Sequence, residues 1–425
     1  MSAVITHSDT GVIHRLMHVD TRYFQGGMLC LAILIYGAWG SPTPDMPGAL
    51  ELLIAALLAV GVGISGFIGA FIFRAKAPGW KQAGQILLIF GLSVPLLSGL
   101  WAGYERGFII RDLVAFGFMV LPVFLSPLMQ VQASMGRFLL YAAVALGLLF
   151  ALRASFDVPG MAAGEALFYL ANMPSVLFAA VFLGGTAMQI FVRDFTLHAT
   201  LTAFALLALA GVSLWSMIEM QQRASLGVFV LSMVCIYGLC LWRNARRSFV
   251  LVCFLVVLVV FLWPEIGDVL NDMERKTALV GGNMRVEEWR AVWGEISVHP
   301  LSLFLGQGWG ATFSSPAVAD IQVNYTHGLL SSLLLKTGLI GFFLGGVYLL
   351  ALARTGLRLF AHAPVLALAL AGPILIDVFL YASFKSLDFG LMLALVVACG
   401  FYGDGKAGSV ETDASVLYAG KTIKG

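Results

Sequence analysis

The stretch GALELLIAALLAVGVGISGFIGAFIF, residues 48–73, decides the fold class of this chain. Glu51 is its only charged residue, and as a helix the stretch is long enough to cross roughly 30 Å of hydrocarbon. Similar apolar stretches recur along the whole chain of 425 residues. We therefore expect an integral membrane protein.

The composition supports this class. The chain is 60% hydrophobic and 11% charged, whereas soluble domains are about half apolar and a quarter charged. The net charge of +2 is too small to indicate a nucleic-acid partner. The five cysteines lie in apolar stretches without the spacing of metal ligands or of a disulfide framework, so we expect them to be packing residues.

We predict an all-α, polytopic fold that forms a single membrane domain over residues 1–425. Twelve apolar stretches are expected to cross the membrane: 24–40, 48–73, 84–102, 109–133, 137–153, 171–192, 198–218, 224–242, 248–263, 326–352, 362–382 and 386–402. With both termini in the cytoplasm, the even-numbered connections and both tails carry most of the 25 Lys and Arg residues. This is the positive-inside bias. It predicts a cytoplasmic C-terminal tail over 403–425 and a large external loop over 264–325.

The external loop contains GGNMRVEEWRAVWGEISVHP, residues 281–300, which predicts an amphipathic helix that ends at Pro300. Its apolar residues recur at helical spacing: Met284, Val286, Trp289, Val292, Trp293 and Ile296. The two tryptophans are expected to anchor the helix at the membrane surface.

A glycine-rich segment follows, LFLGQGWGATFSS at residues 303–315. It lacks the Lys-Ser/Thr of a phosphate-binding P-loop, so a nucleotide site is a weak interpretation. We expect Gly306, Gly308 and Gly310 to let the backbone turn tightly or approach a ligand closely.

The next segment, NYTHGLLSSLLLKTGLIGFFLGG at residues 324–346, places His327 where span ten begins. A lone histidine at a membrane interface is commonly a hydrogen-bonded surface residue. Here the preceding external loop also places arginines at the external membrane face, where His327 is expected. An imidazole with a pKa near 6.5 can accept a proton from an attacking hydroxyl, and guanidinium groups match the oxygens of a diphosphate.

These residues resemble the superfamily of O-antigen ligases and O-antigen polymerases, which are bacterial envelope glycosyltransferases. Three segments carry the resemblance: QRASLGVFVL with Arg223; MRVEEWRAVWGEISVHPLSLFLGQGWG with Arg285, a Trp four residues on, His-Pro and Gly-x-Gly; and HGLLSSLLLKTGLIG with His327 and Gly338. The chain departs from the family at Gln222, where serine is usual, and at Gly328, where asparagine is usual. It also has extra residues between Pro300 and Gly306.

The resemblance implies a GT-C-like enzyme that transfers a glycan from undecaprenyl diphosphate to a sugar hydroxyl, without a metal or a nucleotide sugar. Arg223 and Arg285 would then hold the diphosphate, and His327 would orient or deprotonate the acceptor hydroxyl. Fixed cations there would stabilise the charge that grows on the leaving diphosphate. Further candidates for substrate binding are Arg290, Lys336 and Asp377.

The acceptor remains open. A lipid-linked glycan acceptor would make the protein a polymerase for O-antigen or exopolysaccharide, and a lipid A-core acceptor would make it a ligase. We favour the polymerase slightly, because the sequence after His327 differs from common ligase motifs. A transporter of lipid-linked glycans is the alternative from another class, although no internal repeat supports it. The resemblance also implies the bacterial inner membrane, contact with membrane lipid, and chain-length regulators or export proteins as partners.

Overall fold

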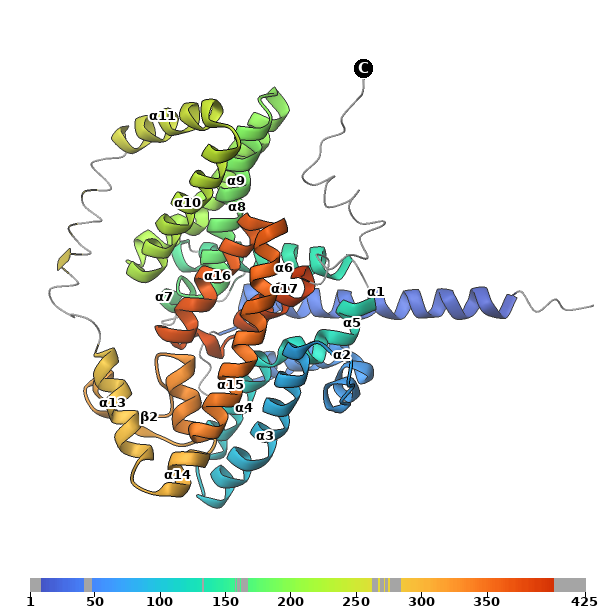
Figure 1. Cartoon of the computed structure of the whole chain (residues 1–425), viewed down its shortest axis with the longest axis vertical. Helices are drawn as coiled ribbons and strands as arrows, with labels where there is room; N and C mark the ends of the chain where they lie inside the picture. Colours follow the sequence, from blue (N-terminus) through green and yellow to red (C-terminus); the bar gives the residue numbers. More distant parts are fainter. Residues whose placement is uncertain are drawn as a thin grey trace, which may run out of the picture.

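The computed structural model describes residues 9–41, 48–131, 134–156, 158, 161, 167–261, 267, 271, 274–275 and 284–400. Most of them are helical (Figure 1). The elements are α1 (Asp9–Trp39), α2 (Ala49–Phe71), α3 (Gly79–Trp101), α4 (Arg106–Met119), α5 (Leu121–Val131), α6 (Ser134–Ser155), α7 (Leu167–Leu170), α8 (Pro174–Arg193), α9 (Leu197–Glu219), α10 (Arg223–Arg243), α11 (Ala245–Phe261), α13 (Arg285–Ile296), α14 (Pro300–Leu305), β1 (Phe313–Ser315), η1 (Pro316–Val318), β2 (Ile321–Val323), α15 (Leu329–His362), α16 (Pro364–Phe379), η2 (Ala382–Lys385) and α17 (Leu387–Gly400).

Eight helical segments of the described chain are long and apolar enough to cross a membrane. They are Ala49–Phe71, Gly79–Trp101, Arg106–Met129, Met135–Ser155, Pro174–Arg193, Leu197–Glu219, Arg223–Arg243 and Leu329–His362. Three shorter apolar helices accompany them, at Tyr23–Trp39, Pro364–Phe379 and Leu387–Gly400. The helices confirm the all-α class and are compatible with a polytopic membrane protein, while the number twelve and the orientation stay predictions.

Three expected spans differ clearly in extent from the helices. The stretch 24–40 is the second half of α1, which already begins at Asp9. The stretch 109–133 is divided into α4 and α5, because Pro122 has no N–H to continue the helical hydrogen bonds and the backbone turns at Val120. The stretch 326–352 continues as a helix to His362, past Arg354 and Arg358. The hydropathy of the sequence predicts only the apolar part of this helix, and the helix continues beyond that part.

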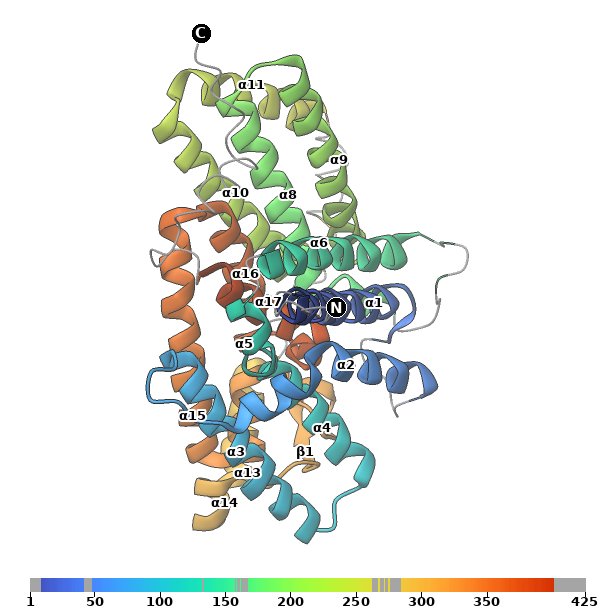
Figure 2. The same ribbon diagram turned by 90° about the vertical axis from the view of Figure 1, so that its right-hand side faces the viewer.

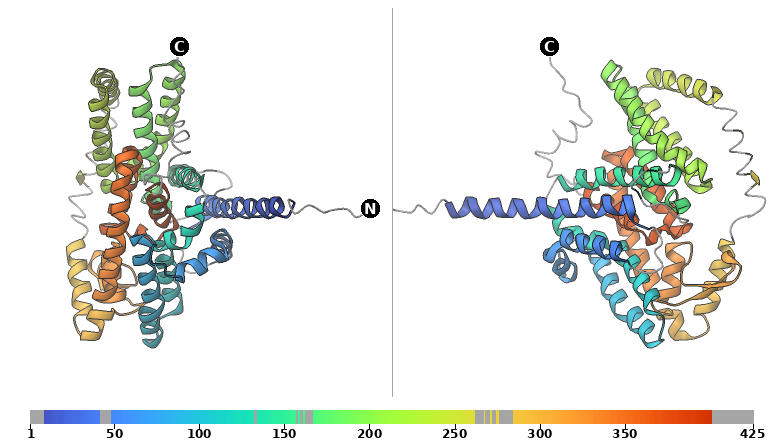
Figure 3. Two further views of the ribbon diagram at one scale, coloured as in Figure 1. Left: turned by 45° about the vertical axis from the view of Figure 1, so that its right-hand side comes forward. Right: turned by 180° about the vertical axis from the view of Figure 1, so that it is seen from behind.

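The ninth expected span, 248–263, is helical within α11, but this helix lies across the ends of α8 and α10 and not alongside them (Figures 1 and 3). The expected tail 403–425 and most of the loop part 264–283 lie outside the described residues.

The core of the molecule is built around α8, most of whose residues are buried, and α17, whose residues are almost all buried. Helices α6, α9, α10 and α16 pack on α8, and α15 packs on α3, α16 and α17. In Figure 2, α8 to α11 form one end of the molecule, and α3, α13, α14 and the lower part of α15 form the other. Helix α1 projects away from both (Figure 1).

The external loop of the sequence prediction is, over residues 284–325, a folded layer against α15. Helices α13 and α14 precede the antiparallel pair β1 and β2, in which Ser314 is opposite Gln322. A second apolar core joins this layer to α15, formed by Val292, Ile296, Phe313, Leu334 and Leu335. Pro300, expected only to end the first helix, also begins α14 as its first residue.

The glycine turn and a kink in α15 fit together. Gly338 has φ 62°, which interrupts α15 and leaves the carbonyls of Leu335 and Lys336 without their helical donors. The amides of Gln307 and of the residue after it donate to these two carbonyls at 2.9 Å. A Cβ on Gly338 would lie 2.4 Å from the Gly306 nitrogen, so the close approach requires glycine.

On its other side the turn is fixed to α3. Pro95 has no N–H, which leaves the Gly91 carbonyl without its helical partner, and the Trp309 indole donates to that carbonyl at 2.7 Å. Gly308 and Gly310, like Gly306, have positive φ. The expected tight turn is therefore confirmed, and the turn closely approaches α3 and α15. Its close approach to a ligand stays a prediction.

Candidate functional site

Helix α13 turns a carboxylate inward. Its buried face contains Glu288, Val292 and Ile296, which recur every four residues. The sequence predicted a face that included Met284, Val286 and Trp293, but about half of each of these side chains is exposed. Glu288, with 2% exposure, lies on the buried face instead, where it contacts Arg285 and His327.

The first partner of Glu288 is His327. The His327 backbone amide donates to Oε1 at 2.9 Å, and Nδ1 lies 2.9 Å from Oε2. Burial raises the pKa of Glu288, but the hydrogen bonds from the side chain and backbone of His327 and the charge of Arg285 outweigh it, so the pKa lies below its usual value. A carboxylate at Nδ1 favours the tautomer with hydrogen on Nδ1, which leaves Nε2 as a proton acceptor.

Arg285 is the second partner. Its Nη1 lies 3.5 Å from Glu288 Oε2, one helical turn away. This nitrogen is buried and has no hydrogen-bond partner of good geometry among the described residues. A guanidinium nitrogen carries two N–H groups, so Nη1 can donate to an anion while it stays paired with Glu288.

Tyr381, in the turn after α16, is influenced both by this pair and by the start of α10. Hydrogen bonding at Ala224 and Ser225 lowers the pKa of its hydroxyl. Burial raises the pKa of Tyr381, and the charges of Arg285 and Arg223 act in the opposite direction. Of the three residues predicted as catalytic, His327 and Arg285 contact the same carboxylate. Arg223, the first residue of α10, acts on Tyr381 through its charge.

Tyr325 lies on another side of His327. The two rings are edge to face, with centroids 5.6 Å apart. Burial raises the pKa of Tyr325, Glu288 raises it further, and Arg111 and Arg285 lower it. The Nζ of Lys385 lies over the Tyr325 ring, 5.4 Å from its centroid. The cluster therefore draws residues from α10, α13, the segment before α15, and the turn between α16 and α17.

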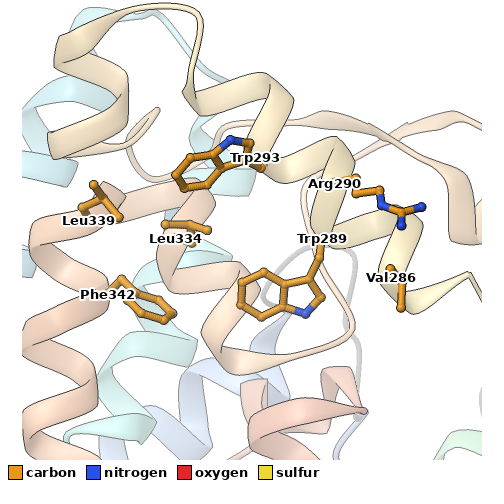
Figure 4. Close-up of a pocket in the computed structure, with 7 residues that line it drawn as sticks. All are labelled: Val286, Trp289, Arg290, Trp293, Leu334, Leu339 and Phe342. Carbon is orange, nitrogen blue, oxygen red and sulfur yellow. The ribbon is translucent and has the colours of Figure 1, made fainter.

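Arg290 does not belong to this cluster. Its side chain is 75% exposed and lies 3.8 Å from Glu287, one turn earlier on α13. It lines an apolar groove between α13 and α15 with a volume of about 430 Å³. The other residues of the groove are Val286, Trp289, Trp293, Leu334, Leu339 and Phe342 (Figure 4). In Figure 4 the Arg290 guanidinium points away from the groove, while both indoles lie toward α15.

Lys336 has a buried partner of its own. Its Nζ lies 2.8 Å from Asp112 Oδ2 on α4, and both side chains are almost fully buried. Lys336 also donates to the Ala311 carbonyl, and the Gly310 amide donates to Asp112 at 2.8 Å. This ion pair connects α4, α15 and the glycine turn.

Asp377 is buried beneath the turn that carries Tyr381. One of its carboxylate oxygens accepts a hydrogen bond from the Ser383 hydroxyl, and the other has no partner among the described residues. The buried Asp377 thus holds the shape of the turn between α16 and η2.

Glu288, Tyr325, Tyr381 and Lys385 are cluster residues that were not predicted. The described part of the chain contains no group of three or more His, Cys, Asp and Glu that could hold a metal ion.

The described helices are compatible with a membrane protein, in which Arg285 and His327 contact one buried carboxylate, Glu288. Neither a family model nor a curated protein matches the chain.

Proposed function

We propose that this protein is a membrane glycosyltransferase that moves a glycan from undecaprenyl diphosphate to a sugar hydroxyl on the periplasmic face of the bacterial inner membrane. The observation that carries the proposal is the contact of one buried carboxylate, Glu288, with both His327 and Arg285. A base and a cation fixed to the same group suit a reaction in which a hydroxyl loses a proton while a phosphate gains charge.

In this reaction the acceptor hydroxyl oxygen attacks the anomeric carbon of the donor sugar. Its proton passes to His327 Nε2, while Glu288 accepts the hydrogen bond from Nδ1 and stabilises the imidazolium. The bond between the anomeric carbon and the diphosphate oxygen breaks, and the oxygen keeps the electron pair. Arg285, whose buried Nη1 is ion-paired with Glu288, and Arg223 stabilise that charge.

The apolar groove beside α13 supports a lipid-linked donor. Its lining of tryptophan, leucine, valine and phenylalanine is apolar, and an isoprenoid chain is apolar as well, so the two surfaces can pack together. Arg285 and the groove residue Val286 are neighbours on α13, so a chain in the groove would end close to the cationic cluster.

The acceptor decides between two forms of this function. We favour a polymerase, which joins lipid-linked repeat units, over a ligase, which transfers the glycan to lipid A-core. Analysis of lipid-linked glycans in cells that lack the protein tests both. Single repeat units that accumulate indicate a polymerase, and long lipid-linked chains indicate a ligase. Unchanged pools would contradict glycosyl transfer and favour transport.

A further inference from the structure

The turn between α16 and α17 holds a cation for which neither the sequence motifs nor the proposed reaction has a use. Lys385 ends η2 and is partly buried. Its Nζ lies 5.4 Å from the centroid of Tyr325 and 5.9 Å from that of Phe384. Tyr325 in turn contacts the imidazole of His327. The ammonium is therefore one aromatic ring away from the proposed base.

The charges around Lys385 do not neutralise it. Within the described part of the chain, no carboxylate lies within ion-pairing distance of its Nζ. Asp112 of α4 attracts the ammonium, but this carboxylate is already bound by Lys336 and the Gly310 amide. Lys336 and Arg111 repel it.

The remaining helices packed against η2 add no counter-charge in contact. Asp377 of α16 accepts its hydrogen bond from Ser383, and Asp388 of α17 accepts from Ser175. A poorly hydrated ammonium without an ion-pair partner is costly unless an anion joins it. We propose that Lys385, which reaches His327 across the Tyr325 ring, binds the diphosphate of the lipid donor as a third cation in addition to Arg285 and Arg223. This inference rests on the proposed function.

The electrostatics predict how this binding changes with pH. Burial lowers the pKa of Lys385 to about 7, helped by Lys336 and Arg111 and opposed by Asp112. Below this pH the amine is charged and attracts phosphate, and above it the amine is neutral and does not. The contribution of Lys385 to binding is therefore present in acid and lost as the pH rises through about 7.

The test is the binding of undecaprenyl diphosphate without a glycan to the full-length protein in nanodiscs, at several pH values. Lys385→Met should weaken binding about tenfold at pH 6.5, where one charge-assisted hydrogen bond is lost. Lys385→Arg should keep the affinity at pH 8.5 where the wild type loses it. Ionisation of the ligand is common to all variants, so the comparison isolates residue 385. Lys76→Met, an exposed lysine between α2 and α3, is the matched control.

Two further arms identify the ligand. Undecaprenyl monophosphate should bind more weakly than the diphosphate and depend less on Lys385. Replacing anionic phosphatidylglycerol in the nanodiscs with neutral phosphatidylcholine should leave the Lys385 effect intact. If the effect disappears in neutral lipid, the residue binds bilayer headgroups and the inference is wrong. If Lys385→Met does not fold, the wild type and Lys385→Arg still test the inference. Equal dependence of diphosphate affinity on pH in these two proteins would overturn it.

The outcome separates this inference from the proposed function. If both Lys385 variants bind the diphosphate with wild-type affinity and glycan transfer still needs His327, then only the proposed role of Lys385 is wrong. If diphosphate binding depends on Lys385 but the protein transfers no glycan, then the proposed reaction is wrong and the proposed diphosphate site stands.

Discussion

The carboxylate of Glu288 receives the backbone amide of His327 at 2.9 Å and lies 2.9 Å from its Nδ1. Two contacts from one residue fix both the position of the imidazole and the direction of its ring. Because Glu288 is on α13 and His327 precedes α15, the pair also joins the folded loop to the helical bundle. The same carboxylate lies 3.5 Å from Arg285, so the base and the cation share one support.

Glu288→Gln is expected to lower the transfer rate between about tenfold and a thousandfold, with the protein still inserted. A glutamine can turn its amide group toward Nδ1, which would favour the wrong histidine tautomer, and it carries no charge to stabilise an imidazolium. Glu287→Gln is the matched control, since Glu287 is on the exposed side of the same helical turn. Equal rates in the two variants would exclude a role for the buried carboxylate.

His327→Ala should lower glycan assembly by about a hundredfold to ten-thousandfold, which is the usual contribution of a general base. Membrane levels of the protein should stay normal, as measured by immunoblotting. His198→Ala, which alters an exposed histidine at the start of α9, should have no effect. Glycan of wild-type length and amount in the His327 variant would refute the catalytic role.

Arg285 and Arg290 should differ sharply although they are on the same helix. Arg285→Lys keeps a positive charge but loses the planar fork that matches phosphate oxygens, so we expect a loss of about tenfold or more in kcat/KM. Arg290→Ala should change kcat/KM less than about twofold, because surface ion pairs contribute little and its side chain is 75% exposed. A loss of kcat/KM in Arg290→Ala larger than in Arg285→Lys would contradict the placement of Arg290 outside the site.

Lys336→Met should act on stability. It leaves Asp112 buried and charged without its partner, which costs about 3–5 kcal/mol. Thermal unfolding in detergent should detect the loss, and the double variant Lys336→Met/Asp112→Leu should recover much of it. A Lys336→Met protein with wild-type stability and no activity would instead make Lys336 a substrate ligand.

Gly338→Ala should destabilise the protein by about 1–3 kcal/mol or more, because the backbone there has φ 62° and a Cβ would lie 2.4 Å from the Gly306 nitrogen. Gly346→Ala, on the same helix with open space around its Cβ position, should be neutral or slightly stabilising. The measurement is again thermal unfolding, and equal midpoints for the two variants would mean that the kink is not needed for stability.

The helical framework was largely predictable, because an apolar stretch in a membrane must form hydrogen-bonded helix along its length. Breaks and ends were less predictable. Pro122 divides one expected span, and α15 continues through Arg354 and Arg358 because a helix persists where its apolar stretch has ended. The glycine turn was recognisable from composition, but its partners on α3 and α15 were not.

The site was predictable only where motifs marked it. Arg285 and His327 were found, whereas Glu288, next to Glu287 in a polar helix, resembled a surface residue. The available signal was its spacing of four and eight residues from Val292 and Ile296, which both face inward. Tyr381 and Lys385 reach the site from a turn far along the chain, and no local spacing indicates such a contact.

The orientation is tested by reporter fusions, which should place residue 290 outside the cell membrane and residue 245 inside. Helix α13, which carries Arg285 and Glu288, lies at the opposite end of the molecule from the connection between α10 and α11 (Figure 1). The reverse result would place the cluster in the cytoplasm, away from an externally exposed lipid-linked glycan.

Glycan transfer by the purified protein in proteoliposomes tests the central claim most directly. The donor is the lipid-linked glycan isolated from cells that lack the protein, and the products are separated as glycans and as lipid diphosphate. The wild type should release undecaprenyl diphosphate and lengthen or transfer the glycan in equal amounts, while His327→Ala should do neither. Glycan that crosses the bilayer with its diphosphate bond intact, or equal bond cleavage in both proteins, would contradict the account.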